Sequence, residues 1–327
     1  MYTGRNLGRL AIIAVLMMPL VSCAFFAELS ALRTFKDANV LYGRADYEGA
    51  VEAYQEVLDV LTENPDSELA QRLTAAYFYI GNSYDNLYKP ALRGDAENDR
   101  YLAEAERHYR LATERIPDQD LRKLSMQYLV SVFGADKMND PSRSEPVLRD
   151  MIQIDPGDPD NYFALARLYE DSGLFDDAET VMQEVRNMRP DDPLVYLQLA
   201  GFYNRGGEFD QTIEALEQRA TIEPDNPEAY YTISTFYWEK AFRDFRITQD
   251  EKRQYVMAGL AAADRALGLN ERYIDALVYK NILLRMQANM TEDLDEQQAM
   301  IAEADELRDR ATELQEAQSS GGAGVAG

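Results

Sequence analysis

The sequence predicts an all-α protein built from repeated pairs of antiparallel helices. The prediction rests on an evenly spaced set of prolines, on an apolar stripe with helical spacing after each proline, and on helix-starting and helix-ending residues at the ends of each stripe. The prolines recur every 34 residues in two sets, Pro156, Pro190 and Pro224, and Pro159, Pro193 and Pro227. A period of this length is the signature of stacked repeats, so we expect the hairpins to pack in series.

The composition is that of a folded and strongly acidic chain. Hydrophobic residues make up 46% of the 327 residues, and 58 acidic residues against 33 basic ones give a formal charge of -25. Such a surface repels phosphate groups, which excludes nucleic acid as a partner class. The charge either favours a basic protein or peptide as the partner or serves solubility alone.

The first residues form a targeting segment. Arg5 and Arg9 precede an apolar run over residues 10–21, which is shorter than the ~20 residues of a membrane span. We therefore predict a cleaved signal peptide over residues 1–22, and its removal leaves the body about two charges more negative.

The end of this segment carries the single cysteine of the chain. Residues 20–23, Leu-Val-Ser-Cys, resemble the lipobox of bacterial lipoproteins. The resemblance implies that Cys23 becomes the lipid-modified N-terminus, bearing acyl chains such as palmitate, and that residues 23–30 link it to the helical body. Ordinary secretory cleavage after Ala24 is the alternative. Since Ala24 is not aspartate, the family's sorting rule implies an outer-membrane lipoprotein facing the periplasm. An inner-membrane anchor and a soluble periplasmic protein are the alternatives.

The first helix of each repeat is predicted by four positions at i, i+3, i+4 and i+7, which share one helix face. They hold an aromatic residue, an aliphatic residue, a small residue and a tyrosine. The three sets are Tyr162, Leu165, Ala166 and Tyr169; Tyr196, Leu199, Ala200 and Tyr203; and Tyr230, Ile233, Ser234 and Tyr237. This pattern resembles the tetratricopeptide repeat, most clearly over residues 158–240.

The residues around each stripe predict where the helices begin and end. Asp158, Asp192 and Asn226 each precede a proline, which places a capping side chain before the first helical turn. Gly173 and Gly207 follow the first helix of two repeats, as helix-ending glycines do. The stretch over 206–209 looks like the GGEF sequence of diguanylate cyclases, but its position in the repeat indicates a turn.

The resemblance implies a tetratricopeptide-type α-solenoid, a right-handed superhelix of about seven helix hairpins, over residues 31–317. Some hairpins are degenerate, and residues 88–100 and 242–254 are predicted insertions. A charged capping helix is expected over 294–317 and a flexible tail over 318–327.

The insertion over 242–254 is basic in an acidic chain, since it holds Arg243, Arg246, Lys252 and Arg253. It predicts either longer helices with a solvated charged face or a docking edge for an acidic partner or a neighbouring subunit.

No catalytic or metal-binding motif is recognised. His108 is the only histidine, and one histidine does not make a metal site. We therefore predict no catalytic residue, no metal, no cofactor and no small-molecule substrate, and expect a non-enzymatic scaffold that binds a protein or peptide, possibly a basic one. A self-associating structural protein and an enzyme with an unrecognised site are the alternatives.

The resemblance implies that the partner binds the concave surface formed by the first helices. The residues that it places there are Phe78, Asn82, Phe163, Arg167, Leu197, Asn204, Tyr231, Thr235 and Trp238. Packing against the next repeat is the alternative for each of them. Trp238, the only tryptophan, is the strongest candidate because it lies beside the apolar stripe and not within it.

Overall fold

A computed structural model of the chain describes residues 27, 29–61 and 68–322. The predicted signal peptide and Cys23 lie outside these residues. All regular structure in the described part is helical. None of the helices in this described part combines the length and the apolar character that a membrane span requires.

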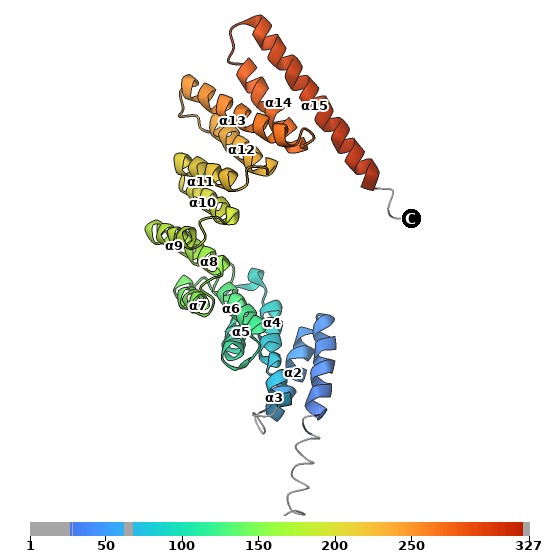
Figure 1. The fold of residues 1–327 in the computed structure, drawn as a ribbon. Helices are drawn as coiled ribbons and strands as arrows, with labels where there is room; N and C mark the ends of the chain where they lie inside the picture. The colour runs from blue at the N-terminus through green and yellow to red at the C-terminus, as the bar shows by residue number, and fades with distance from the viewer. Residues whose placement is uncertain (1–26, 28, 62–67, 323–327) are drawn as a thin grey trace, which may run out of the picture. The chain divides into compact units, whose positions relative to one another are not determined.

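The helices follow one another in short succession (Figure 1). A first helix covers residues 29–43. The remaining elements are α2 (Tyr47–Leu61), α3 (Glu68–Leu73), α4 (Ala75–Leu87), η1 (Pro90–Leu92), α5 (Ala96–Arg115), α6 (Gln119–Val132), α7 (Pro141–Ile154), α8 (Pro159–Asp171), α9 (Phe175–Met188), α10 (Pro193–Gly206), α11 (Phe209–Ile222), α12 (Pro227–Arg243), α13 (Gln249–Leu269), α14 (Ile274–Ala288) and α15 (Leu294–Gly322).

The chain forms two compact units, and the boundary between Val181 and Met182 falls inside α9. In the first unit α4 pairs with α5, α6 packs on α5, and α7 packs on α6 and α8. In the second unit α10 pairs with α11, α12 with α13 and α14 with α15, and each pair packs on the next. This serial pairing of helices confirms the predicted all-α, tetratricopeptide-type solenoid as the architecture.

The predicted helix starts are confirmed by their capping hydrogen bonds. The side chains of Asp158, Asp192 and Asn226 each accept a backbone N–H from the residue two positions on, over 3.1, 3.0 and 3.0 Å. A proline then occupies the first turn of α8, α10 and α12. A cap of this kind contributes about 1 kcal/mol, so the caps define where each repeat begins.

The first tyrosine of each of these repeats has a second role besides packing. Its hydroxyl donates to the carbonyl of the proline six residues before it. The bonds run from Tyr162 to Pro156 (3.2 Å), from Tyr196 to Pro190 (2.9 Å) and from Tyr230 to Pro224 (3.4 Å). Each first helix is thereby tied to the turn that precedes it.

The turn interpretation of residues 206–209 is also confirmed. α10 ends at Gly206, Gly207 has a φ of 81°, and α11 begins at Phe209. Gly173 occupies the same place in the previous repeat with a φ of 75°. A residue with a side chain is strained in this left-handed conformation, which explains glycine at both positions.

The two predicted insertions differ in structure. The insertion over 88–100 contains the short helix η1 and the first turn of α5. The insertion over 242–254 lengthens α12 to Arg243 and starts α13 at Gln249, so only residues 244–248 link the two helices. Longer helices are therefore what this second insertion builds.

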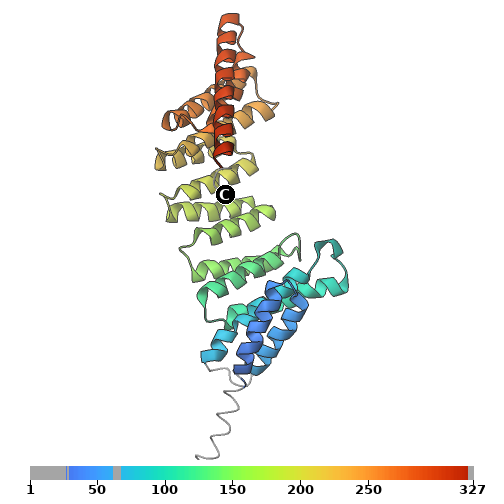
Figure 2. The same cartoon turned by 90° about the vertical axis from the view of Figure 1, so that its right-hand side faces the viewer.

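The C-terminal helix is longer than predicted. α15 packs on α14 as the last helix of the series and continues to Gly322, so residues 318–322, predicted as tail, are helical. At the other end, residues 29 and 30 of the predicted linker are helical. Figure 2 shows α15 steeply inclined to the preceding helices of its unit, whereas α14 lies alongside it in Figure 1.

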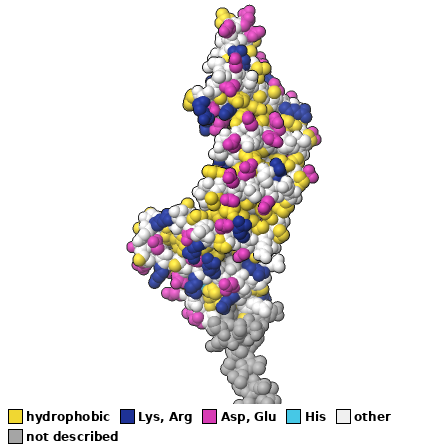
Figure 3. All heavy atoms as spheres, turned by 90° about the vertical axis from the view of Figure 1, so that its left-hand side faces the viewer, with side chains coloured by type: hydrophobic (Ala, Val, Ile, Leu, Met, Phe, Trp, Pro, Cys, Tyr) yellow, Lys and Arg dark blue, Asp and Glu magenta, His cyan; other side chains and the backbone are white. Residues whose placement is uncertain are grey.

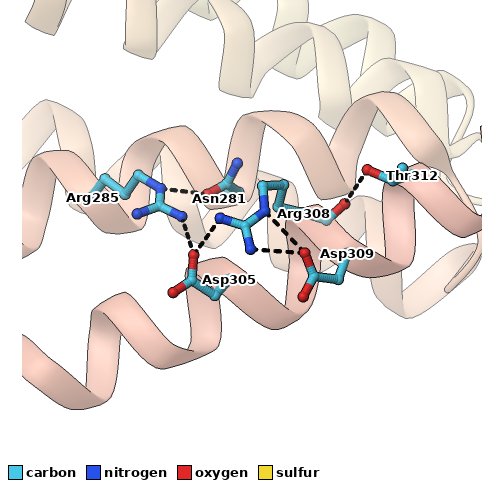
Figure 4. A network of polar contacts seen from close by, with 6 residues as sticks. All are labelled: Asn281, Arg285, Asp305, Arg308, Asp309 and Thr312. Carbon is cyan, nitrogen blue, oxygen red and sulfur yellow. Dashed lines mark hydrogen bonds and ion pairs between the residues drawn. The ribbon is translucent and has the colours of Figure 1, made fainter.

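Polar contacts fix α15 against α14 (Figure 4). Arg285 of α14 donates to Asn281 over 2.9 Å and to Asp305 of α15 over 2.6 Å. Arg308 donates to the same Asp305 oxygen over 2.6 Å and also bonds Asp309. Because these pairs are exposed and each contributes at most about 1 kcal/mol, they set the register of α15 more than they stabilise it.

Candidate functional site

Five aromatic side chains of the second unit contact one another in series. They come from α12, from α14 and from the turn before α14, and we refer to them as the aromatic face: Tyr231, Trp238, Phe242, Tyr273 and Tyr279. The three residues of α12 are seven and four positions apart, a spacing that places them on one side of the helix. The aromatic face therefore follows from the helical period of α12 together with the packing of α14 on it.

The rings meet mainly edge to face. The Tyr231 ring lies 5.4 Å from the rings of both Tyr273 and Tyr279, at angles of 82° and 81°. The Tyr279 ring lies 5.3 Å from the Trp238 ring at 87°. Phe242 stacks on the indole at 5.4 Å and 10°. Such pairs contribute about 0.5–1.5 kcal/mol each beyond their buried area, which keeps the surface in one arrangement.

Trp238 belongs to both the surface and the core. It is half-buried and packs against a buried cluster that includes Val256, Leu283 and Leu284. Its indole Nε1 is buried and has no hydrogen-bond acceptor among the described residues. Phe242, which covers the indole, keeps 57% of its surface exposed. The aromatic face is therefore firmly supported from below and accessible at Phe242.

Carboxylates border the aromatic face. Burial raises the pKa of Tyr231 to about 12, and the negative charge of Asp275 is the next cause, ahead of the neighbouring tyrosines and Glu228. The pKa of Tyr273 is also raised by burial, and again Asp275 and then Glu228 add to the effect. The charge of Arg219 acts in the opposite direction on Tyr273, and Arg219 pairs with Glu228 at 3.3 Å. Asp275 is therefore the carboxylate that favours a cation beside these rings.

Three predicted partner-binding residues lie on α12, where Tyr231 and Trp238 join the aromatic face. The hydroxyl of the third, Thr235, donates to the carbonyl of Thr232 over 2.7 Å. The sequence reasoning missed Phe242, Tyr273 and Tyr279. The four-residue step from Trp238 to Phe242 is a signal that could have found Phe242. The other two lie beyond the insertion, where the period of 34 no longer applies.

The prediction that Phe78 and Asn82 line the partner-binding groove is wrong, because the structure places both side chains in the interior. Phe78 is 5% exposed and Asn82 is 4% exposed. The Phe78 ring contacts the rings of Tyr109 and Tyr128 at 6.0 and 5.6 Å. Asn82 accepts a hydrogen bond from the Tyr42 hydroxyl over 2.7 Å. Side chains of neighbouring helices thus occupy the position where a partner was expected.

The remaining predicted residues are on the surface or half-buried. Phe163 and Leu197 are half-buried on α8 and α10. Arg167 is exposed, forms an ion pair with Asp171 at 3.1 Å, and lines a cavity of about 330 Å³ in the first unit. Asn204 is exposed and lines an open groove of about 560 Å³ in the second unit.

His108 is a buried structural residue. It is 2% exposed and its ring lies 6.5 and 6.0 Å from the rings of Tyr77 and Tyr84. Burial first, and the charge of Arg107 second, lower its pKa to about 3, so the imidazole is neutral near pH 7. Among the described residues, no group of three or more His, Cys, Asp or Glu side chains is placed to hold a metal ion.

Comparisons with known proteins agree with the repeat pattern. A tetratricopeptide repeat family model matches residues 137–201. No curated protein matches the sequence.

Three similar solved structures are all repeat proteins of low sequence identity. The C-terminal part of a TPR repeat-containing protein from Cytophaga hutchinsonii is 15% identical, with 86% of this chain and 98% of that chain covered and a TM-score of 0.49. A tetratricopeptide repeat protein from Parabacteroides merdae is 10% identical, with 84% and 99% covered and a TM-score of 0.43. YrrB, a TPR protein with an unusual peptide-binding site, is 18% identical, with 62% and 91% covered and a TM-score of 0.38. The repeated caps, tyrosines and helix pairs agree with the family match, which shows tetratricopeptide repeats over residues 137–201.

Proposed function

We propose that the protein is a non-enzymatic scaffold that holds a basic segment of a partner protein on the aromatic face. The observation that carries this proposal is the series of five aromatic side chains with Asp275 and Glu228 beside it. Binding energy at protein interfaces concentrates in a few tryptophan, tyrosine and arginine side chains. Here the scaffold supplies the aromatic residues, and the partner supplies lysine or arginine.

The recognition chemistry follows from the geometry. Phe242 and Tyr231 are eleven positions apart on α12, which is about 16 Å along the helix, so the segment needs two contacts. The aliphatic stem of one lysine or arginine packs on the exposed Phe242 ring, and a second basic side chain lies beside Tyr231, where Asp275 supplies negative charge. Rigid rings lose little conformational freedom on binding, so affinity does not depend on ordering this surface.

We further propose that a lipid on Cys23 anchors this scaffold in the bacterial cell envelope, at the outer membrane facing the periplasm. Support comes from the basic start, the short apolar run and the single cysteine at its end. A single acyl chain binds a membrane only marginally, so stable anchoring needs more than one chain on this residue.

A site-specific photo-crosslinker tests the aromatic face in the native cell. Position 242 is the probe, and position 257 on α13 is the matched control because Phe242 and Met257 are 57% and 55% exposed. We expect a discrete crosslinked protein from position 242 only. Adding Asp275→Asn should weaken this product, and adding Asp295→Asn, a charge change on α15, should not. Equal products from both positions, or none from either, would refute the proposal.

The anchor is tested separately by fractionation of the same cells. We expect the unaltered chain in the membrane fraction with labelled palmitate incorporated, and Cys23→Ser in the soluble fraction without label. A Cys23→Ser protein that stays in the membrane fraction contradicts a lipid anchor and leaves the aromatic face untouched.

A further inference from the structure

A second surface of the same unit has the opposite character. An open groove of about 560 Å³ lies where the hairpins α10–α11 and α12–α13 make their turns. We refer to it as the basic groove, and the lining residues that carry the argument are Phe209, Phe236, Lys240, Arg243, Phe245 and Arg246.

The apolar part of the basic groove is formed by phenylalanines from three segments. Phe209 begins α11, Phe236 lies on α12, and Phe245 lies in the link to α13. The Phe245 side chain is 96% exposed. An exposed apolar patch that is rimmed by polar side chains marks an interaction surface.

The basic side chains are held at the rim by two carboxylates. Glu239, which also lines the groove, pairs with Arg243 at 2.8 Å. Asp244 bonds Lys240 over 2.9 Å and Arg246 over 2.9 Å through two guanidinium nitrogens. These hydrogen bonds hold the pKa of Asp244 well below its usual range. The Lys240 ammonium lies 5.1 Å from the centre of the Phe209 ring. Lys240 is thereby fixed toward the groove, while Arg246 remains 88% exposed.

The local charge is reversed relative to the chain. Over residues 239–253 the basic residues are Lys240, Arg243, Arg246, Lys252 and Arg253, and the acidic ones are Glu239, Asp244, Asp250 and Glu251. Five positive against four negative charges leave this stretch with one net positive charge, whereas the whole chain carries -25. On the face drawn in Figure 3, acidic, basic and hydrophobic side chains are interspersed. A stretch with net positive charge is an exception to the charge of the chain as a whole.

We propose that the basic groove is a second docking site, which takes an extended acidic segment of another protein that carries one apolar side chain. The carboxylates of this segment replace Glu239 and Asp244 as partners of Arg243 and Arg246, whose present ion pairs are exposed and weak. Its apolar side chain packs among Phe209, Phe236 and Phe245. Complementary charge steers such a segment here, because the net acidic remainder of the chain repels it. This site is independent of the aromatic face, so the two surfaces fit partners of opposite charge.

Fluorescence anisotropy of the full chain with a labelled peptide tests this proposal. The probe is the peptide Glu-Asp-Leu-Asp-Glu, and the control probe carries the uncharged glutamine or asparagine in place of each acid. We expect saturable binding of the acidic probe only, weakened by added salt. Arg246→Glu should weaken it by about tenfold. Arg272→Glu, an equal charge change at an exposed residue outside the groove, should change it by less than about twofold.

A second variant and a second measurement separate the remaining outcomes. Phe245→Ser should lower the affinity without affecting the fold, because the ring is almost fully exposed. Equal binding of both probes, or an unchanged affinity in both variants, would overturn the proposal. So would sedimentation that shows a dimer which Arg246→Glu converts to monomer, since the occupant would then be a second copy of this chain.

Discussion

The second hairpin, α4–α5, and the repeats that begin at α8, α10 and α12 use polar groups differently. In those repeats the last tyrosine can bond a neighbouring helix, as Tyr203 does with Gln183. The capping bonds from backbone N–H groups and the bonds of the first tyrosine, however, join residues only two or six positions apart. In the second hairpin, Tyr42 donates to Asn82 across 40 positions, and the Asn82 amide donates to the Tyr109 hydroxyl across 27. The repeats therefore satisfy these groups locally, whereas the second hairpin satisfies them through its neighbours.

The same repeat position can consequently be core in one hairpin and surface in another. Asn82 and Arg167 occupy matching positions in the repeat pattern. Asn82 is 4% exposed, whereas the Arg167 side chain is 52% exposed. The difference arises because α2 and α5 both pack on α4 and close over Asn82. A repeat pattern thus predicts where a helix turns but not which of its positions a neighbour covers.

The sharpest test of this comparison is Asn82→Ala, with Arg167→Ala as the matched control. Loss of the amide leaves the buried Tyr109 hydroxyl without its donor and creates a cavity, so the free energy of unfolding should fall by about 3 kcal/mol. The control should cost less than about 0.5 kcal/mol, as exposed substitutions do. Urea unfolding followed by circular dichroism measures both, and equal losses would show that burial does not separate these positions.

The pH dependence of the free energy of unfolding tests the burial of His108, which lies in the second hairpin. Its pKa is about 3 in the folded chain against 6.5 for the free side chain. As the pH falls below about 6.5, the unfolded chain takes up a proton that the folded chain does not, so the folded state loses stability progressively down to pH 3. Between pH 7 and pH 5 the loss should be about 2 kcal/mol.

His108→Gln supplies the control for this pH dependence. Glutamine does not titrate, so the variant should be less stable at pH 7 but lose about 2 kcal/mol less than the unaltered chain on going to pH 5. Parallel unfolding curves of the two proteins at both pH values would show that His108 is not the group responsible.

Removing a contact within one repeat should lower the free energy of unfolding by less than Asn82→Ala does. Asp192→Ala removes the hydrogen bond to the Leu194 N–H at the start of α10 and should lower stability by about 1 kcal/mol. Hydrogen exchange should quicken in the first turn of α10, while the amides of α4 stay protected. Faster exchange in α4 as well would contradict the local character of these contacts.

The smallest effect is expected for Tyr196→Phe. It deletes one hydroxyl, whose bond to the Pro190 carbonyl is exposed, and so should cost about 0.5 kcal/mol. The ring and its packing remain, and thermal unfolding should shift only slightly. A loss as large as that of Asn82→Ala would remove the distinction drawn here.

Sequence reasoning succeeded where the cause lies within one repeat. The caps at Asp158, Asp192 and Asn226 and the glycine turns were predicted because each depends on residues a few positions apart. The groove was predicted less well, since the burial of Phe78 depends on rings from α5 and α6. Tyr279 was missed because the insertion over 242–254 shifts the register by an amount that only the structure reveals.

In the repeats that begin at α8, α10 and α12, the bond between the first tyrosine and the proline before it lies within the repeat. Cap, turn and hydroxyl all find their partners inside the same 34 residues, as in Asp192, Pro190 and Tyr196. A whole repeat can therefore be duplicated or removed without leaving these polar groups without their hydrogen-bond partners. The α4–α5 hairpin has no such freedom, because cutting it out would leave Tyr42 without the acceptor that Asn82 provides.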